Sequence, residues 1–250
     1  MLAYLGLSAG NFWDYVRIPG GQPERDSVKA IYNLPLYGSC TDVSGKMVKL
    51  AITHDTVLDS ALVWAGDGYY HDLQYRFAKY NAATGDTWEA WNDCLLPMNT
   101  PVPVPDLDRD SVSDTIIYRP STAVVESTDA VVGSMGGNIK VVLTLHSKVV
   151  MTSSLSPDSL LLTEYRSYYY VPDFGITKVM LDSVETVVYK GSFSYSGTSP
   201  VGRGKVLSSL GINERLRASP DKEYDGPTYD VSGRRTDRNG RLRKGRLVIF

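Results

Sequence analysis

The sequence predicts a mainly β protein: an antiparallel curved sheet or half-barrel with few short helices and a small C-terminal hairpin tail. Three observations support this fold class. Runs of β-branched and aromatic residues recur along the chain, as at 141–146, 165–171 and 184–189. Gly, Asn, Asp and Pro interrupt these runs at short intervals, which is typical of strands joined by tight turns. Tyr outnumbers Phe by 17 to 5, and tyrosine suits half-buried sheet positions with its hydroxyl at the rim.

Individual elements are indicated by local patterns. Residues 46–53 alternate in part between apolar and polar side chains, which favours a strand. The glycine-rich segment 133–138 precedes a strand rather than a helix, so we expect a hairpin loop there and not a phosphate-binding turn. Helical periodicity is scarce, and only 60–65 and 206–217 are candidates for a few helical turns.

Charge and length exclude two broad classes. The 250 residues carry 26 basic and 28 acidic side chains, for a net charge of −2. A general nucleic-acid binder would show a basic surplus, so no nucleic-acid partner is expected. Nor does any stretch approach the ~20 apolar residues that a membrane-spanning helix needs, so no transmembrane segment is expected.

Composition changes near Gly197 and divides the chain. We expect an antiparallel β-domain over 5–195, a linker over 196–226 and a separate tail over 227–250. Residues 213–250 hold ten basic against six acidic side chains and end on four apolar residues. Three interpretations of the tail stay open: a solvated linker with a frayed end, a short hairpin that a partner recognises, or an RNA-binding tail, although no aromatic residues interleave its arginines.

An acidic loop is the candidate metal site. Alternating carboxylates in a tight loop can point several oxygens at one hard cation, which suits Ca²⁺. Ser111 stands where a calcium loop has glycine, and Ile117 where it has a bidentate Glu. A solvated acidic connector is therefore the competing interpretation, and calcium is the one cofactor considered. The candidate metal ligands are Asp106, Asp108, Asp110 and Asp114.

Aromatic side chains offer a candidate ligand platform, with a buried aromatic cluster as the alternative. The candidate ligand-binding residues are Trp64, Trp88, Trp91 and Tyr169. The three histidines match no zinc spacing, and no nucleophile elbow or P-loop occurs. Catalytic residues therefore stay unknown, and an enzyme is the less favoured class.

Three ordered segments carry a resemblance. Residues 7–15 contain Gly-Asn-Phe-Trp-Asp-Tyr, residues 80–88 contain Gly-Asp-Thr-Trp, and residues 168–178 read Tyr-Tyr-Tyr-Val-Pro-Asp-Phe-Gly-Ile-Thr-Lys. In this order they resemble a family of secreted or lipid-anchored Bacteroidetes-type β-domains of unknown function, with a curved sheet shaped like a lipoprotein carrier. The chain departs from the family at 172–174, where Pro-Asp-Phe replaces the commoner Pro-Gly-Val.

The tail carries a second resemblance. Tyr-Asp-Val-Ser-Gly-Arg-Arg at 229–235 and Lys-Gly-Arg-Leu-Val-Ile at 244–249 look like the end of a type IX secretion sorting signal. Leu247 replaces the usual Tyr. The resemblance implies a role in sorting for Tyr229, Gly233, Arg234, Arg235, Lys244 and Gly245.

Both resemblances imply a secreted or outer-surface location, with the type IX machinery as partner and a signal peptide upstream of Met1. Export would favour a disulfide between Cys40 and Cys94 over two small buried thiols. The leading hypothesis is a non-enzymatic surface or secreted β-domain with a binding or structural role and an unidentified ligand. A secreted glycan-active hydrolase and a periplasmic lipid or lipoprotein carrier are the alternatives.

Overall fold

A computed structural model describes residues 5–33, 45–54, 57–66, 68–72, 75–91, 97–106, 111–151, 158–211, 228–230 and 235–236. Its strands are β1 (Phe12–Ile18), β2 (Pro23–Asn33), β3 (Gly45–His54), β4 (Val57–Gly66), β5 (Tyr69–Asp72), β6 (Tyr75–Lys79), β7 (Thr87–Glu89), β8 (Pro101–Val104), β9 (Asp114–Val132), β10 (Met135–Met151), β11 (Asp158–Val171), β12 (Gly175–Lys190), β13 (Phe193–Gly211), β14 (Thr228–Asp230) and β15 (Arg235–Thr236).

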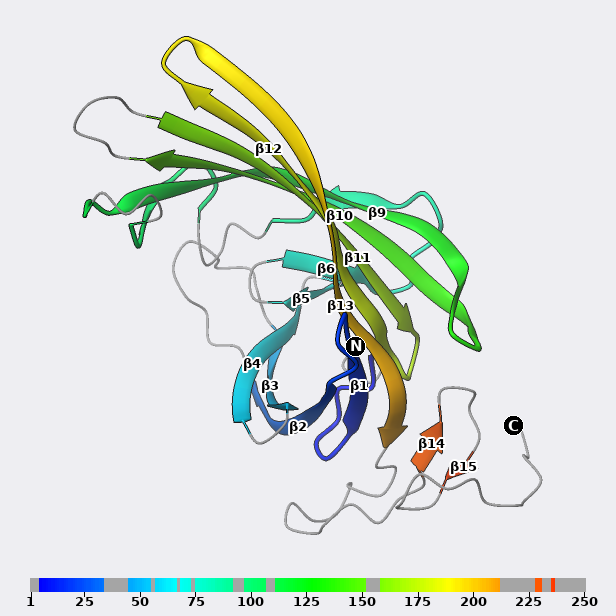
Figure 1. Cartoon of the computed structure of the whole chain (residues 1–250). Helices are drawn as coiled ribbons and strands as arrows, with labels where there is room; N and C mark the ends of the chain where they lie inside the picture. The colour runs from blue at the N-terminus through cyan, green and yellow to red at the C-terminus, as the bar shows by residue number, and fades with distance from the viewer. Residues whose placement is uncertain are drawn as a thin grey trace.

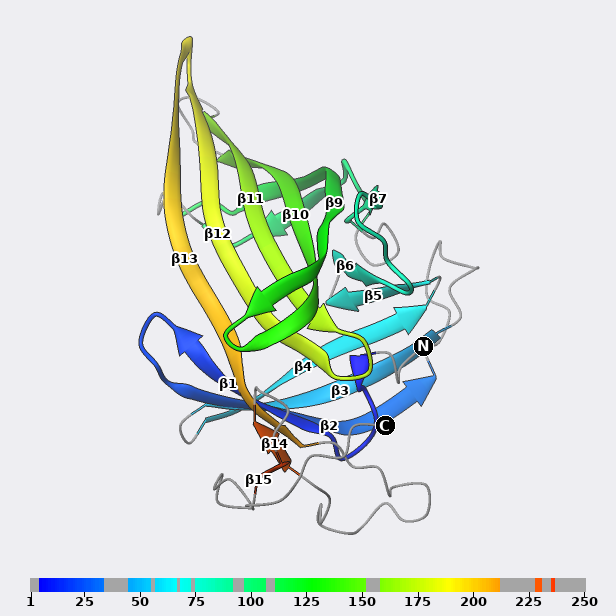
Figure 2. The ribbon, with the colours of Figure 1, turned by 90° about the vertical axis from the view of Figure 1, so that its right-hand side faces the viewer.

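These strands form one open antiparallel sheet, which confirms the predicted fold class. Its order is β6-β5-β4-β3-β2-β1-β13-β12-β11-β10-β9-β7, with β8 beside β9. Most consecutive strands are neighbours, but β7 and β8 both pair with β9, and β1 pairs with β13, which joins the N-terminal strands to the long C-terminal ones. Figures 1 and 2 show β1–β5 curving across one end of the molecule while β9–β13 rise away from it.

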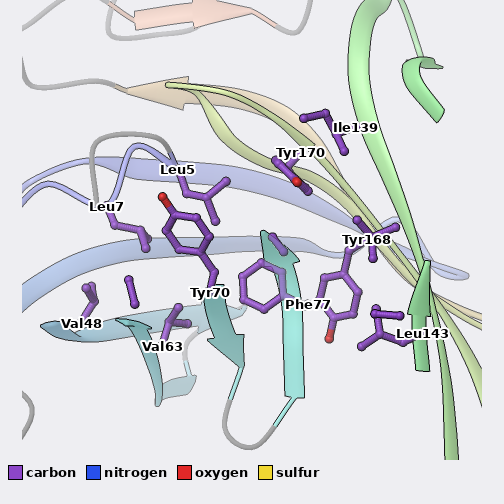
Figure 3. Close-up of a cluster of buried hydrophobic side chains, with 14 of the residues drawn as sticks. Leu5, Leu7, Val48, Val63, Tyr70, Phe77, Ile139, Leu143, Tyr168 and Tyr170 are labelled. Carbon is purple, nitrogen blue, oxygen red and sulfur yellow. The ribbon is translucent and has the colours of Figure 1, made fainter. Parts of the chain in front are cut away.

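The core lies where the two parts of the curved sheet face each other. Tyr70 and Phe77 from β5 and β6 meet Leu143 and Tyr168 from β10 and β11 (Figure 3). The Phe77 and Tyr168 rings stack with centroids 5.0 Å apart. Odd-numbered residues of β10 from Val141 to Leu145 are buried, so strand alternation defines an inner face, turned toward this core, and an outer face.

The three resemblance segments hold the sheet together. Trp13 donates its indole N–H to the carbonyl of Phe174 over 2.8 Å, and the Tyr15 hydroxyl donates to the carbonyl of Ile176 over 2.9 Å. The first segment therefore closes onto the turn of the third. In the middle segment, the indole N–H of Trp88 donates to the carbonyl of Arg76 over 2.8 Å. Because Trp13 and Trp88 are buried, these motif residues build the core.

Several local predictions are corrected by the strands. Residues 60–65 lie in β4 and residues 206–211 in β13, so neither segment forms the helical turns that we expected. The predicted linker cannot begin at 196, because β13 continues to Gly211 and pairs with both β12 and β1. The hairpin predicted at 133–138 is present, since β9 ends at Val132 and β10 begins at Met135.

The predicted tail hairpin is represented by two short strands. β14 pairs with Ser209–Gly211 of β13 and with β15. Three residue pairs join β14 to β13, so the described part of the tail has few contacts with the main domain, as expected of a separate hairpin. The second strand expected at 247–250 lies outside the described residues.

Candidate functional site

A network of four charged side chains spans β1, β2 and β13 on the inner face. The Lys205 ammonium contacts Glu24 at 2.7 Å and Asp26 at 2.5 Å, and the Arg17 guanidinium contacts Glu24 at 2.6 Å. Their positions are set by the strand register, since Arg17 lies opposite Lys205 and Tyr15 opposite Glu24. The two carboxylates and two cations balance, so the network is neutral.

Because its two carboxylates are buried, the network depends on Lys205 and Arg17 to keep them ionised. The carboxyl side chains of Glu24 and Asp26 are only 6% and 8% exposed. Burial would raise the pKa of Glu24, but Lys205 and Arg17 outweigh it and hold that pKa below its usual value. Burial raises the pKa of Asp26, and Lys205 offsets this only in part. Within the described part of the chain, Asp26 Oδ1 has no hydrogen-bond partner.

An open cleft of about 510 Å³ adjoins the network. Such a volume falls within the range usual for small-molecule sites. Most of its charged lining belongs to the network, but Arg203 is exposed and no ion pair engages it among the residues that the structure describes. Counting only the described residues, the cleft therefore presents one uncompensated positive charge. Its lining comprises Arg17, Ile18, Pro19, Gln22, Glu24, Val179, Arg203, Gly204 and Lys205.

A row of mainly apolar side chains, the apolar track, leads from the cleft along β12. Thr186 interrupts it, and the ion pair of Arg166 and Glu164 lies beside it on β11. Val179, which lines the cleft, packs against the core, and Leu181 is the cross-strand partner of Arg203. After the irregularity at residue 182, Val184 and Val188 continue on the same inner face, and both are half-buried. At about 3.3 Å per residue this track is about 25–30 Å long.

Carboxylates near the aromatic residues serve other roles. Asp72 accepts a hydrogen bond from the Tyr168 hydroxyl over 3.2 Å, and burial raises its pKa. Asp86 pairs with Lys79 at 2.8 Å, and Glu89 accepts the backbone N–H groups of Trp91 and Ser121. The contacts of these three carboxylates are of the kind that stabilise a fold.

The predicted aromatic platform is dispersed. Trp88 and Trp91 are 8% and 3% exposed, so both lie in the interior rather than on a surface that a ligand could reach. Tyr169 is half-buried and lies between the amino groups of Lys140 and Lys178, at 5.8 and 5.1 Å from its ring centre. The side chain of Trp64 lies outside the described residues.

The acidic loop is only partly described. Asp106 accepts the backbone N–H of Ser111 over 2.7 Å, and Asp114 is buried at the start of β9. Asp108 and Asp110 lie outside the described residues, and among those described no group of three metal-ligating side chains occurs. Calcium binding stays a prediction.

Two further predictions fall mainly outside the described residues. Cys40 and Cys94 both lie beyond them, so the disulfide stays a prediction. Of the sorting residues, Tyr229 lies in β14 and Arg235 in β15. Gly233, Arg234, Lys244 and Gly245 are not described.

The charged network and the cleft were missed by sequence reasoning. Part of the network could have been found in the sequence. Glu24, Asp26 and Val28 lie two residues apart, so their side chains share one face of a strand. Carboxylates at core-facing positions require a buried cation. Nothing local identifies Lys205, which lies 181 residues from Glu24.

Comparison with known proteins adds one distant likeness. The chain matches no protein-family model and no curated protein. It is similar to the crystal structure of a provisionally named lipoprotein from Parabacteroides distasonis ATCC 8503, with a TM-score of 0.40 and 12% identity. The match covers 83% of this chain and 98% of the other.

Within its described part, the structure contains no helix long and apolar enough to cross a membrane.

Proposed function

We propose that this chain is an exported binding protein that holds an anionic amphiphile, a molecule with an apolar chain and a carboxylate or phosphate group. The observation that carries the proposal is Arg203, an exposed guanidinium at the cleft whose cross-strand partner Leu181 lies on the apolar track. Guanidinium groups bind carboxylate and phosphate oxygens through paired, charge-assisted hydrogen bonds. The track then provides a surface for the apolar chain.

The charge balance of the cleft supports an anion rather than a cation. Arg17 and Lys205 are already neutralised by Glu24 and Asp26, so an anion does not have to break these pairs. Arg203 adds one positive charge at the open side. Gln22 adds amide donors to the lining.

Replacing Arg203 by Met should weaken the binding of dodecanoate and dodecyl phosphate about 10- to 100-fold, because a hydrogen bond to a charged group contributes about 1.5–3 kcal/mol. The measurement is calorimetric or fluorescence titration. Dodecanol should bind wild type and variant alike, and inorganic phosphate tests whether the anionic group suffices alone. Arg119→Met is the matched control, since Arg119 is also exposed and lies in β9, four strands away from β13 in the sheet. Equal losses in both variants, or no binding by wild type, would contradict the proposal.

We propose further that the tail is a type IX sorting signal, which would place the protein outside the cell. The sequence resemblance at 229–235 and 244–249 supports this address. The tail's described contact with the sheet is limited to three residue pairs between β14 and β13, so the sheet does not depend on it for its core.

Deleting residues 228–250 should leave the sheet folded and stop the protein from appearing outside the cell. The checks are circular dichroism on the purified chain and immunoblots of cell and medium fractions. The control is an Arg241→Lys and Arg243→Lys variant, which keeps the charge of the tail, lies outside both motifs and should still be exported. A truncated chain that still reaches the medium rejects the sorting hypothesis, and one that unfolds shows that the tail belongs to the folded domain.

A further inference from the structure

The tip of the β12–β13 hairpin carries the most exposed aromatic residues of the described chain. Phe193 is 80% exposed and Tyr195 68% exposed, and Tyr189 beside them is 41% exposed. The last pair between β11 and β12 joins Ser159 to Tyr189. On this hairpin only Lys190, Phe193 and the turn between them lie beyond that pair. In Figures 1 and 2 this tip is the outermost point of the long strands.

Strand alternation places the two most exposed rings on one face. Phe193 and Tyr195 are two residues apart in β13, and Tyr195 lies opposite Val188, at the far end of the apolar track. The segment 187–201 contains Lys190 as its single charged residue and no acidic residue. The tip therefore presents exposed aromatic rings among small uncharged residues, with Lys190 beside them and Asp158 at the start of the neighbouring strand β11.

We infer that this tip inserts into the interfacial layer of a lipid bilayer. Aromatic rings with a polar edge concentrate at the membrane–water interface, and a lysine beside them can bury its stem while its ammonium stays in water.

The size of the patch favours a bilayer over a protein partner. The two aromatic side chains on this face, Phe193 and Tyr195, bury about 150–250 Å² each at most, and both are already partly covered. A stable protein interface needs about 800 Å² on each side. A bilayer needs no such matched surface, because each ring gains by entering the apolar layer on its own.

Vesicle co-sedimentation tests the inference on the full chain. Vesicles of phosphatidylcholine, with and without phosphatidylglycerol, should both pellet wild type, because binding depends on the apolar rings rather than on charge. Phe193→Ser combined with Tyr195→Ser should reduce the bound fraction about tenfold or more, because the apolar area is lost. Leu58→Ser combined with Val131→Ser removes residues of matching exposure, 69% and 67%, away from the tip, and should leave binding unchanged.

Three results would overturn the inference. The first is that wild type stays in solution with both vesicle types, which means that the chain does not bind bilayers. A tip variant that binds like wild type, or a control variant that loses as much, removes the tip as the site. Self-association that depends on the tip, without vesicle binding, assigns the patch to a second copy of the chain. The tip variant should bind dodecanoate as wild type does, so failure here is separate from failure of the cleft proposal.

Discussion

Replacing Lys205 by Met should reduce the free energy of unfolding by about 3–5 kcal/mol, the usual result of removing one partner of a buried ion pair. The substitution leaves Glu24 and Asp26 almost fully buried without the ammonium that they share. In this variant the unpaired carboxylate of Asp26 costs more free energy than that of Glu24, because Glu24 retains its ion pair with Arg17. Urea unfolding measured by circular dichroism gives the difference.

The deficit of this variant should be largest near pH 7 and shrink toward pH 4. In wild type the pKa of Glu24 is held low by Lys205 and Arg17, so its ionised form stabilises the fold above the pKa of the unfolded chain and this contribution disappears as pH falls. Without Lys205 the buried carboxyls favour protonation, so acid removes their penalty in the variant. Unfolding curves at several pH values check the sign.

Two further variants make this result interpretable. Lys178→Met removes a lysine from the neighbouring strand β12 whose ammonium contacts the ring of Tyr169 at 5.1 Å, and it should cost about 1 kcal/mol or less. Adding Asp26→Asn to Lys205→Met should recover part of the loss, because one unpaired charge is removed with it. A Lys178 variant as unstable as the Lys205 variant would show that the network has no special role.

Replacing Gly175 by Ala should destabilise the fold by about 2–6 kcal/mol, the combined range for left-handed backbone strain and for overpacking. Gly175 has a φ of +106°, where L side chains are rare, and an added Cβ would lie 2.8 Å from Trp13 Nε1 and 2.9 Å from the carbonyl of Leu5. To relieve the clash the indole must move, which breaks its bond to the carbonyl of Phe174.

Gly191→Ala is the matched control for this variant. Gly191 also has a positive φ, +57°, but no atom lies within 4 Å of its added Cβ. It should lose only about 1 kcal/mol, since strain acts there without a clash. Thermal unfolding of both variants separates the two contributions, and equal losses would mean that contact with Trp13 is unimportant.

The sequence alone determined most of the local architecture. Period-2 runs and turn residues predicted the long strands and the hairpin after Val132, because side-chain alternation and turn chemistry act over a few residues. The ordered motifs identified residues that the fold needs: Trp13 and Trp88 are buried and donate to backbone carbonyls. Export, the disulfide and calcium binding stay predictions from the same source.

Tertiary structure alone decided the role of β13 and the site on it. Gly197, Pro200 and Gly202 make its sequence look like a linker. They lie in the half of β13 that pairs with β12 and not with β1, and such an edge position tolerates proline and glycine. Residues 204–206 of β13 pair with both β1 and β12. Lys205 meets Glu24 only because the chain returns after 181 residues to lie beside β1. Composition is a local property, whereas strand pairing and the neutralisation of buried charge join distant segments, so the cleft emerges only when the sheet is assembled.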